Sequence, residues 1–258
     1  MAKKSPTGNA TKLNALIKKA KSAAKAFEAP DPRDPAHQLA VALLQFNHTR
    51  KAAEDAHAAL LEAFVDLHEL RVSHPHEIVD VIGEDYPAAY ERAIRLREAL
   101  NAVYAREHDV TLKTVATKGK REQRSYLDTL PATPPYAAAS VALLSFGAHA
   151  FPVDDKLCAL LIAEGVMEDD ARPADGESFI IKTLKAGEAL EAHVAIQAWA
   201  DKRKAPAITK KPAAAPKKKA ASKKSTAKTT KTTKASKTTK KVAKKTTKKK
   251  VARTAKKK

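Results

Sequence analysis

The side chains best suited to hold a metal ion or to act as a nucleophile are histidine and cysteine, and the chain has nine histidines and one cysteine. The densest group is the run HPHE at residues 74–77. No histidine stands four residues from another with an acidic residue between them, and no cysteine lies nearby to complete a ligand set. We therefore predict no metal centre, and we expect these histidines to be solvated residues at the start of a helix.

The single cysteine and the few glycines exclude further kinds of chemistry. Cys158 lies in an apolar run and is predicted to be a core residue. One cysteine cannot form a disulfide framework within the chain, which suits a reducing compartment. The seven glycines include no phosphate-binding loop pattern, which disfavours a nucleotide-binding fold. We predict no cofactor.

Lysine dominates the last part of the chain. Residues 202–258 hold 25 lysine and arginine side chains, no acidic residue and few apolar residues that could form a core. Such a segment is predicted to be disordered and to bind double-stranded DNA through its phosphates, with release of counterions. Flexible lysines do not distinguish base edges, so this binding would be independent of sequence. The predicted contacts are Lys217, Lys218, Lys219, Lys223, Lys224, Lys240, Lys241, Lys244, Lys245, Lys248, Lys249 and Lys250.

Other interpretations of residues 202–258 stay open. RNA or an acidic protein would attract the same lysines, and a polycation can also serve solubility alone. A shorter basic segment, TKGKR, occupies residues 117–121. Its side chains and the following arginine are expected either to contact backbone phosphates or to lie in a solvated loop; they are Lys118, Lys120, Arg121 and Arg124.

Charge is divided unevenly along the chain. The formal net charge is +20, yet residues 29–201 contain 17 basic and 28 acidic residues, a net charge of −11. An acidic body with basic ends is the asymmetry of a protein held electrostatically on a polyanion. We divide the chain into a basic N-terminal arm with a proline-rich linker (1–35), a body (36–201) and a basic tail (202–258).

The predicted fold class is all-α. Apolar residues recur at helical spacing through the body, and no window alternates apolar and polar residues for long enough to predict a strand. Helices are expected at 36–46, 51–70, 75–83, 87–106, 122–130, 136–150, 154–163, 177–184 and 188–201, with a short turn at 110–116. A basic amphipathic helix at 11–29 is expected either to dock on the body or to form a second phosphate-contacting arm, with binding to a membrane surface as a third interpretation.

Nothing in the sequence indicates secretion or insertion in a membrane. The N-terminal lysines are not followed by an apolar signal segment, and the longest apolar run, residues 137–151, is too short to span a bilayer. We expect a cytoplasmic protein associated with the nucleoid, or a nuclear one if the source is eukaryotic.

Four short runs of the body have spacing typical of one family. They are LLQFN at 43–47, YERAI at 90–94, LPATPP at 130–135 and PVD at 152–154. Over about residues 36–200 this pattern resembles the helix-hairpin-helix DNA glycosylases of the endonuclease III-like superfamily. The resemblance implies a helical fold in which a hairpin of two helices faces DNA.

The resemblance also implies roles for three residues. Asp154 matches the family's aspartate, whose carboxylate stabilises the cationic sugar or activates water as the N-glycosidic bond breaks. Asn47 matches the glutamine that fills the hole left by a flipped base. Tyr136 replaces the lysine that forms a Schiff base in strand-cleaving members, and an aromatic ring there could stack on a flipped base. Two of them also have a structural interpretation: Asp154 as a helix N-cap, and Tyr136 as a residue at a helix start that packs its ring and keeps its hydroxyl in water.

Several parts of the family pattern are changed. Ala132 and Pro134 stand where two hairpin glycines let backbone N–H groups grip a phosphate, so the hairpin is either a weakened anchor or only a rigid turn. No cysteines follow Trp199 to hold an iron–sulfur cluster, and Trp199 is expected to close the core. Two functions remain: a DNA-binding protein of this fold whose catalysis is degenerate, or a monofunctional base-excision glycosylase with Asp154 as its carboxylate.

Overall fold

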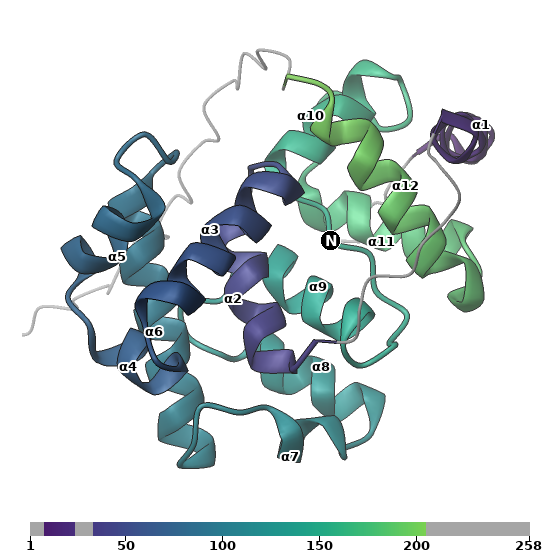
Figure 1. The fold of residues 1–258 in the computed structure, drawn as a ribbon. Helices are drawn as coiled ribbons and strands as arrows, with labels where there is room; N and C mark the ends of the chain where they lie inside the picture. The colour runs from purple at the N-terminus through teal and green to yellow at the C-terminus, as the bar shows by residue number, and fades with distance from the viewer. Residues whose placement is uncertain (1–7, 24–32, 205–258) are drawn as a thin grey trace, which may run out of the picture. The chain divides into compact units, whose positions relative to one another are not determined.

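The computed structural model describes residues 8–23 and 33–204, and this part of the chain is all-α (Figure 1). The helices are α1 (Ala10–Ala23), α2 (Pro35–Gln45), α3 (Arg50–Ala63), α4 (Leu67–Val72), α5 (Pro75–Ile82), α6 (Ala89–Glu107), α7 (Lys113–Ala116), α8 (Lys120–Asp128), α9 (Pro135–Leu144), α10 (Asp155–Ala163), α11 (Pro173–Thr183) and α12 (Ala189–Asp201), with a 3₁₀ turn, η1 (Ala186–Glu188), before the last. The predicted fold class is confirmed.

A first hydrophobic cluster joins α2 to α9. Helix α2 lies at its centre and packs against α3, α6 and α9. Its sequence, PAHQLAVALLQ, is apolar on nearly every side, and such a helix is stable only when neighbours surround it. The side chains of the alanines in α9 are small, so its backbone can approach that of α2 closely.

A second hydrophobic cluster joins helices from both ends of the described chain. It contains α1 together with α10, α11 and α12, and Figure 1 shows α1 beside α12. Leu13, Leu16 and Ile17 of α1 are buried in it, so this helix docks on the body, as in the first of its predicted alternatives. Cys158 and Trp199 are also buried in this cluster, which confirms both as core residues.

Two predicted helices were too long. Residues 51–70 form two helices, because the Asp66 carboxylate accepts the Glu69 N–H at 2.9 Å and so begins α4 as a new N-cap. The helix predicted at 136–150 ends at Leu144, and Gly147 has a left-handed φ of +58° soon after it. Ala150 and Phe151, which follow Gly147, are buried without being helical, so the apolar run did not continue the helix.

One buried cation connects α6 to the end of α2. The guanidinium of Arg92 donates to the backbone oxygens of Leu43 at 3.1 Å, Leu44 at 2.7 Å and Phe46 at 2.6 Å. These carbonyls belong to the last turn of α2 and the residue after it, and the last turn of a helix has no intrahelical donors for its carbonyls. Arg92 thereby joins two of the runs that carry the family pattern.

We predict that replacing Arg92 by methionine lowers the free energy of unfolding by about 3–5 kcal/mol, because several buried carbonyls lose charged donors at once. Urea denaturation monitored by circular dichroism measures this change. Arg121→Met is the matched control: Arg121 is exposed, and its replacement is expected to change stability by no more than about 0.5 kcal/mol. An equal loss in both variants would contradict the role given to Arg92.

Candidate functional site

Asp154 is the N-cap of α10 and is only 4% exposed. One carboxylate oxygen accepts the Leu157 N–H at 2.7 Å, and the other accepts the Asn47 N–H at 2.9 Å. Burial raises the pKa of Asp154, and the two N–H donors oppose that rise. The capping interpretation of Asp154 is confirmed, and a catalytic role for it stays a prediction.

Asn47 forms the corner that follows α2 and reaches Asp154 across more than a hundred residues of sequence. Its φ is +59°, a left-handed conformation that asparagine tolerates better than most residues. Its side-chain N–H₂ donates to the Asp155 carboxylate at 3.2 Å, and its side-chain oxygen accepts the Lys156 N–H at 3.3 Å. Backbone and side chain of Asn47 are therefore both attached to the first turn of α10.

Tyr136 lies in the first turn of α9 and is 2% exposed. Its ring centroid lies 6.0 Å from that of Phe46. Burial raises the pKa of the Tyr136 hydroxyl, and the charge of Asp154 raises it further. The structure thus brings Asn47, Tyr136 and Asp154 together as the resemblance implied, but the tyrosine ring is covered and cannot stack on a base without movement of its neighbours.

A row of polar residues on α12 borders the same region and was missed from the sequence. His193, Gln197 and Asp201 recur every fourth residue, which places them on one face of the helix. The Asp201 carboxylate accepts the Arg50 N–H at 3.0 Å and the Gln197 side-chain N–H at 2.8 Å. Burial lowers the pKa of His193 to about 3, so its ring is neutral at pH 7. The spacing on a largely apolar helix was the signal that could have found this row.

A second residue that sequence analysis missed is Arg95, one turn after Arg92. Its guanidinium lies over the Phe46 ring, 5.5 Å from the centroid. Arg95 also lines a pocket of about 270 Å³ together with Ile94, Glu91, Glu98 and Ala132. It therefore lies between the corner after α2 and the turn that joins α8 to α9.

That turn keeps the conformation expected of a glycine. Ala132 has a φ of +57°, which is unfavourable for a residue with a β-carbon, and it stands where the family has its first hairpin glycine. Pro134 and Pro135 have no N–H to offer, and the Thr133 N–H donates to the Leu130 carbonyl at 3.3 Å. Few backbone donors of the turn are left for an anion, and two carboxylates, Glu91 and Glu98, line the pocket beside it.

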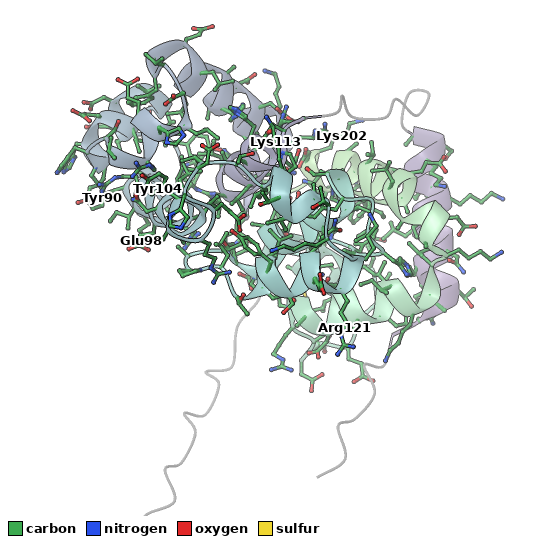
Figure 2. The ribbon with its side chains drawn as sticks, turned by 90° about the horizontal axis from the view of Figure 1, so that it is seen from below. Tyr90, Glu98, Tyr104, Lys113, Arg121 and Lys202 are labelled. Atoms are coloured by element: carbon green, nitrogen blue, oxygen red, sulfur yellow. The ribbon has the colours of Figure 1, made fainter. Side chains whose placement is uncertain are left out.

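The predicted phosphate contacts near the hairpin differ in their availability. Arg124 is held by two carboxylates, Glu177 at 2.6 Å and Asp128 at 2.8 Å. Lys120 donates to the Phe146 carbonyl. Lys118 is exposed and lies 5.5 Å from the centroid of the Tyr126 ring, and Arg121 is also exposed. Figure 2 shows Arg121 well apart from Lys113, so these two cations do not lie in one compact patch.

The predicted contacts of the tail lie outside the described residues. They are Lys217, Lys218, Lys219, Lys223, Lys224, Lys240, Lys241, Lys244, Lys245, Lys248, Lys249 and Lys250. Within the described ranges, no group of three or more His, Cys, Asp and Glu side chains could hold a metal ion. None of the helices within these ranges is long and apolar enough to cross a membrane.

The arrangement of these helices is the fold of the helix-hairpin-helix DNA glycosylases. A trapped covalent intermediate of endonuclease III with DNA superposes with a TM-score of 0.59 at 16% identity, covering 74% of this chain and 85% of that one. The 3-methyladenine DNA glycosylase of H. pylori gives 0.55 at 14% identity, covering 77% and 100%. The 8-oxoguanine glycosylase/lyase of Clostridium acetobutylicum, in complex with DNA, gives 0.57 at 15% identity, covering 73% and 68%. No family model and no curated protein matches the sequence.

We predict that Asp154→Ala lowers the free energy of unfolding by about 3 kcal/mol, because α10 loses its cap and the Asn47 N–H loses its acceptor. Asp154→Asn keeps the acceptor for Leu157 and should cost about half as much. Asp169→Asn, at an exposed position, is the matched control and should be neutral. Chemical denaturation checks the order of the three variants, and an Asp154→Ala protein as stable as the control would refute the structural role of this carboxylate.

Proposed function

We propose that this protein binds double-stranded DNA with a body of glycosylase fold, is held there without sequence preference by its lysine-rich tail, and does not excise bases. The observation that carries the proposal is the state of Asp154. Both oxygens of this buried carboxylate accept backbone N–H groups, so it stabilises the structure between α2 and α10. A carboxylate used in this way is poorly placed to meet a sugar.

The two other parts of the family mechanism support the same proposal. Tyr136 stands where strand-cleaving members carry a nucleophilic lysine, and its ring is buried. The turn at residues 130–135 contains three prolines, and the pocket beside it is lined by Glu91 and Glu98. Carboxylates repel phosphates, so we expect the hairpin to contribute little to DNA affinity.

The distribution of charge assigns most of the affinity to the tail. Residues 29–201 have a net charge of −11, whereas residues 202–258 hold 25 cations and no acid. An acidic body gains little electrostatic binding free energy from a negatively charged duplex. Each lysine of the tail that neutralises a phosphate, by contrast, releases a counterion. The body would then serve to orient the protein on DNA or to bind partners.

A second candidate function is a monofunctional DNA N-glycosylase with Asp154 as its carboxylate. The observation that favours it is the convergence of Asn47, Tyr136 and Asp154, with Arg92 and Lys156 close enough to influence the local charge. These two cations could meet an anionic DNA backbone beside the carboxylate, although Asp155 and Asp201 lie in the same region. Catalysis would require DNA to release Asp154 from the Asn47 N–H.

The two functions predict different responses to damaged DNA. The full chain should be titrated against an intact duplex and against the same duplex with an abasic-site analogue, at several salt concentrations. We expect equal affinity for both duplexes, with a fall of about 10³–10⁵ between 50 and 200 mM salt if 6–10 phosphates are contacted. Glutamine at the seven lysines between residues 240 and 250 should flatten this salt dependence, whereas Lys182→Gln with Lys185→Gln should leave it unchanged.

A preference for the abasic duplex of more than about tenfold, lost in Asp154→Ala, would overturn the proposal in favour of the glycosylase. Release of a base from a duplex with damaged bases would do the same. Affinity that does not depend on the tail lysines would show that the body is the main DNA-binding element.

A further inference from the structure

A small pocket opens between α1 and α12, and Asp154 is not among its lining residues. Its volume is about 220 Å³. Pockets for whole small-molecule ligands are typically about 300–1,000 Å³, so this one has room for a single large side chain or a group of similar size. The lining residues are Lys19, Ala20, Ala23, Ala198, Trp199, Lys202 and Arg203.

The inner wall of the pocket is apolar. Ala20, Ala23 and Ala198 leave open the space that larger side chains would fill. Trp199 is 5% exposed, and its indole N–H has no hydrogen-bond partner although it is buried. This nitrogen is shielded from solvent, so the indole contributes its apolar surface to the pocket wall.

Every charged residue of the pocket is a cation. Lys19 and Lys202 are exposed, and Lys202, labelled in Figure 2, follows the last residue of α12. The Arg203 guanidinium lies over the Trp199 ring, 4.3 Å from its centroid, and donates to the Trp199 carbonyl at 2.9 Å. Within residues 8–23 and 33–204, no carboxylate forms an ion pair with any of these three side chains.

We propose that this pocket binds an acidic peptide segment of a partner protein that presents one large apolar side chain. The apolar side chain would enter between the alanines and Trp199, and flanking carboxylates would pair with Lys19, Lys202 and Arg203. Tryptophan and arginine are the residues that most often dominate binding energy in protein interfaces. Because every charged residue of the pocket is a cation, charge complementarity favours an acidic partner segment.

The same cations could meet a DNA phosphate, but the pocket favours a peptide. Phosphate contacts use exposed cations and backbone N–H groups and need no apolar cavity. Here the cations surround a cavity whose wall is alanine and tryptophan. An apolar side chain next to a carboxylate matches both features, whereas a phosphodiester matches only the charge.

The experiment uses the fluorescence of Trp199, which is the only tryptophan in the chain. The full-length protein should be titrated with the blocked hexapeptide Asp-Asp-Leu-Leu-Asp-Asp and with Asp-Asp-Ser-Ser-Asp-Asp, which has the same charge. Both peptides also meet the lysines of residues 205–258, so only the leucine-dependent change in emission reports the pocket. We expect saturable binding of the leucine peptide and at least about tenfold weaker binding of the serine peptide.

Two kinds of variant localise the binding. Lys19→Glu with Lys202→Glu should weaken the leucine peptide about tenfold or more, while Lys182→Glu with Lys185→Glu, exposed lysines outside the pocket lining, should not. Ala198→Leu fills the cavity without changing the charge and should also weaken binding. Circular dichroism verifies that each variant is folded.

Three results would overturn the proposal. The first is a Trp199 emission that neither peptide changes. The second is equal binding of the leucine and serine peptides, which would reduce the pocket to a patch of charge. The third is a change in emission produced only by a DNA duplex, which would make this a phosphate-binding site.

Discussion

The carbonyl groups at the end of α2 are buried, and the rest of the site depends on the way they are satisfied. A helix end inside a protein needs donors from elsewhere, and here a single guanidinium, Arg92, supplies several of them. The hydroxyl of Tyr86 adds another donor at 3.0 Å from the Leu44 oxygen. This arrangement fixes where the chain leaves α2 and therefore sets the position of Phe46 and Asn47. A cation that is buried for this purpose is costly to desolvate, but it is also difficult to replace, because only arginine presents so many donors in one plane.

The corner after α2 in turn determines what Asp154 can do. Asn47 presents its backbone N–H to one carboxylate oxygen, and the first turn of α10 presents Leu157 to the other. The bond between Asn47 and Asp154 connects the end of α2, which belongs to the first hydrophobic cluster, to the start of α10, which belongs to the second. The resemblance to the glycosylases implies that the catalytic aspartate stands at this same position. We infer that in this chain the carboxylate has become part of the connection between α2 and α10, while a changed hairpin and an acidic body leave DNA affinity to the tail.

Much of the fold could be predicted from sequence because it rests on local patterns. Apolar spacing predicted the helices of the body, and the family resemblance implied roles for Asn47, Tyr136 and Asp154, which lie close together in the structure. Sequence could not show that Asp66 begins a new helix, since a capping aspartate within an amphipathic stretch looks like any solvated acid. It also could not show that Tyr136 is covered or that Arg124 is held by Glu177, because both follow from contacts between distant segments. The left-handed Ala132 was concealed for a different reason: alanine gives no sign that the backbone has kept a glycine conformation.

The most direct test of this account is the amide hydrogen exchange of Asn47, measured by NMR on the full chain with and without a duplex that contains an abasic-site analogue. The Asn47 N–H is held by a buried carboxylate, so we predict that it exchanges slowly and that its protection is the same in the free and the DNA-bound protein. If Asp154 serves catalysis, DNA must draw the carboxylate away from this N–H. Faster exchange of Asn47 on binding the abasic duplex, with no change for amides in the middle of α2, would contradict the structural role of Asp154 and support the glycosylase.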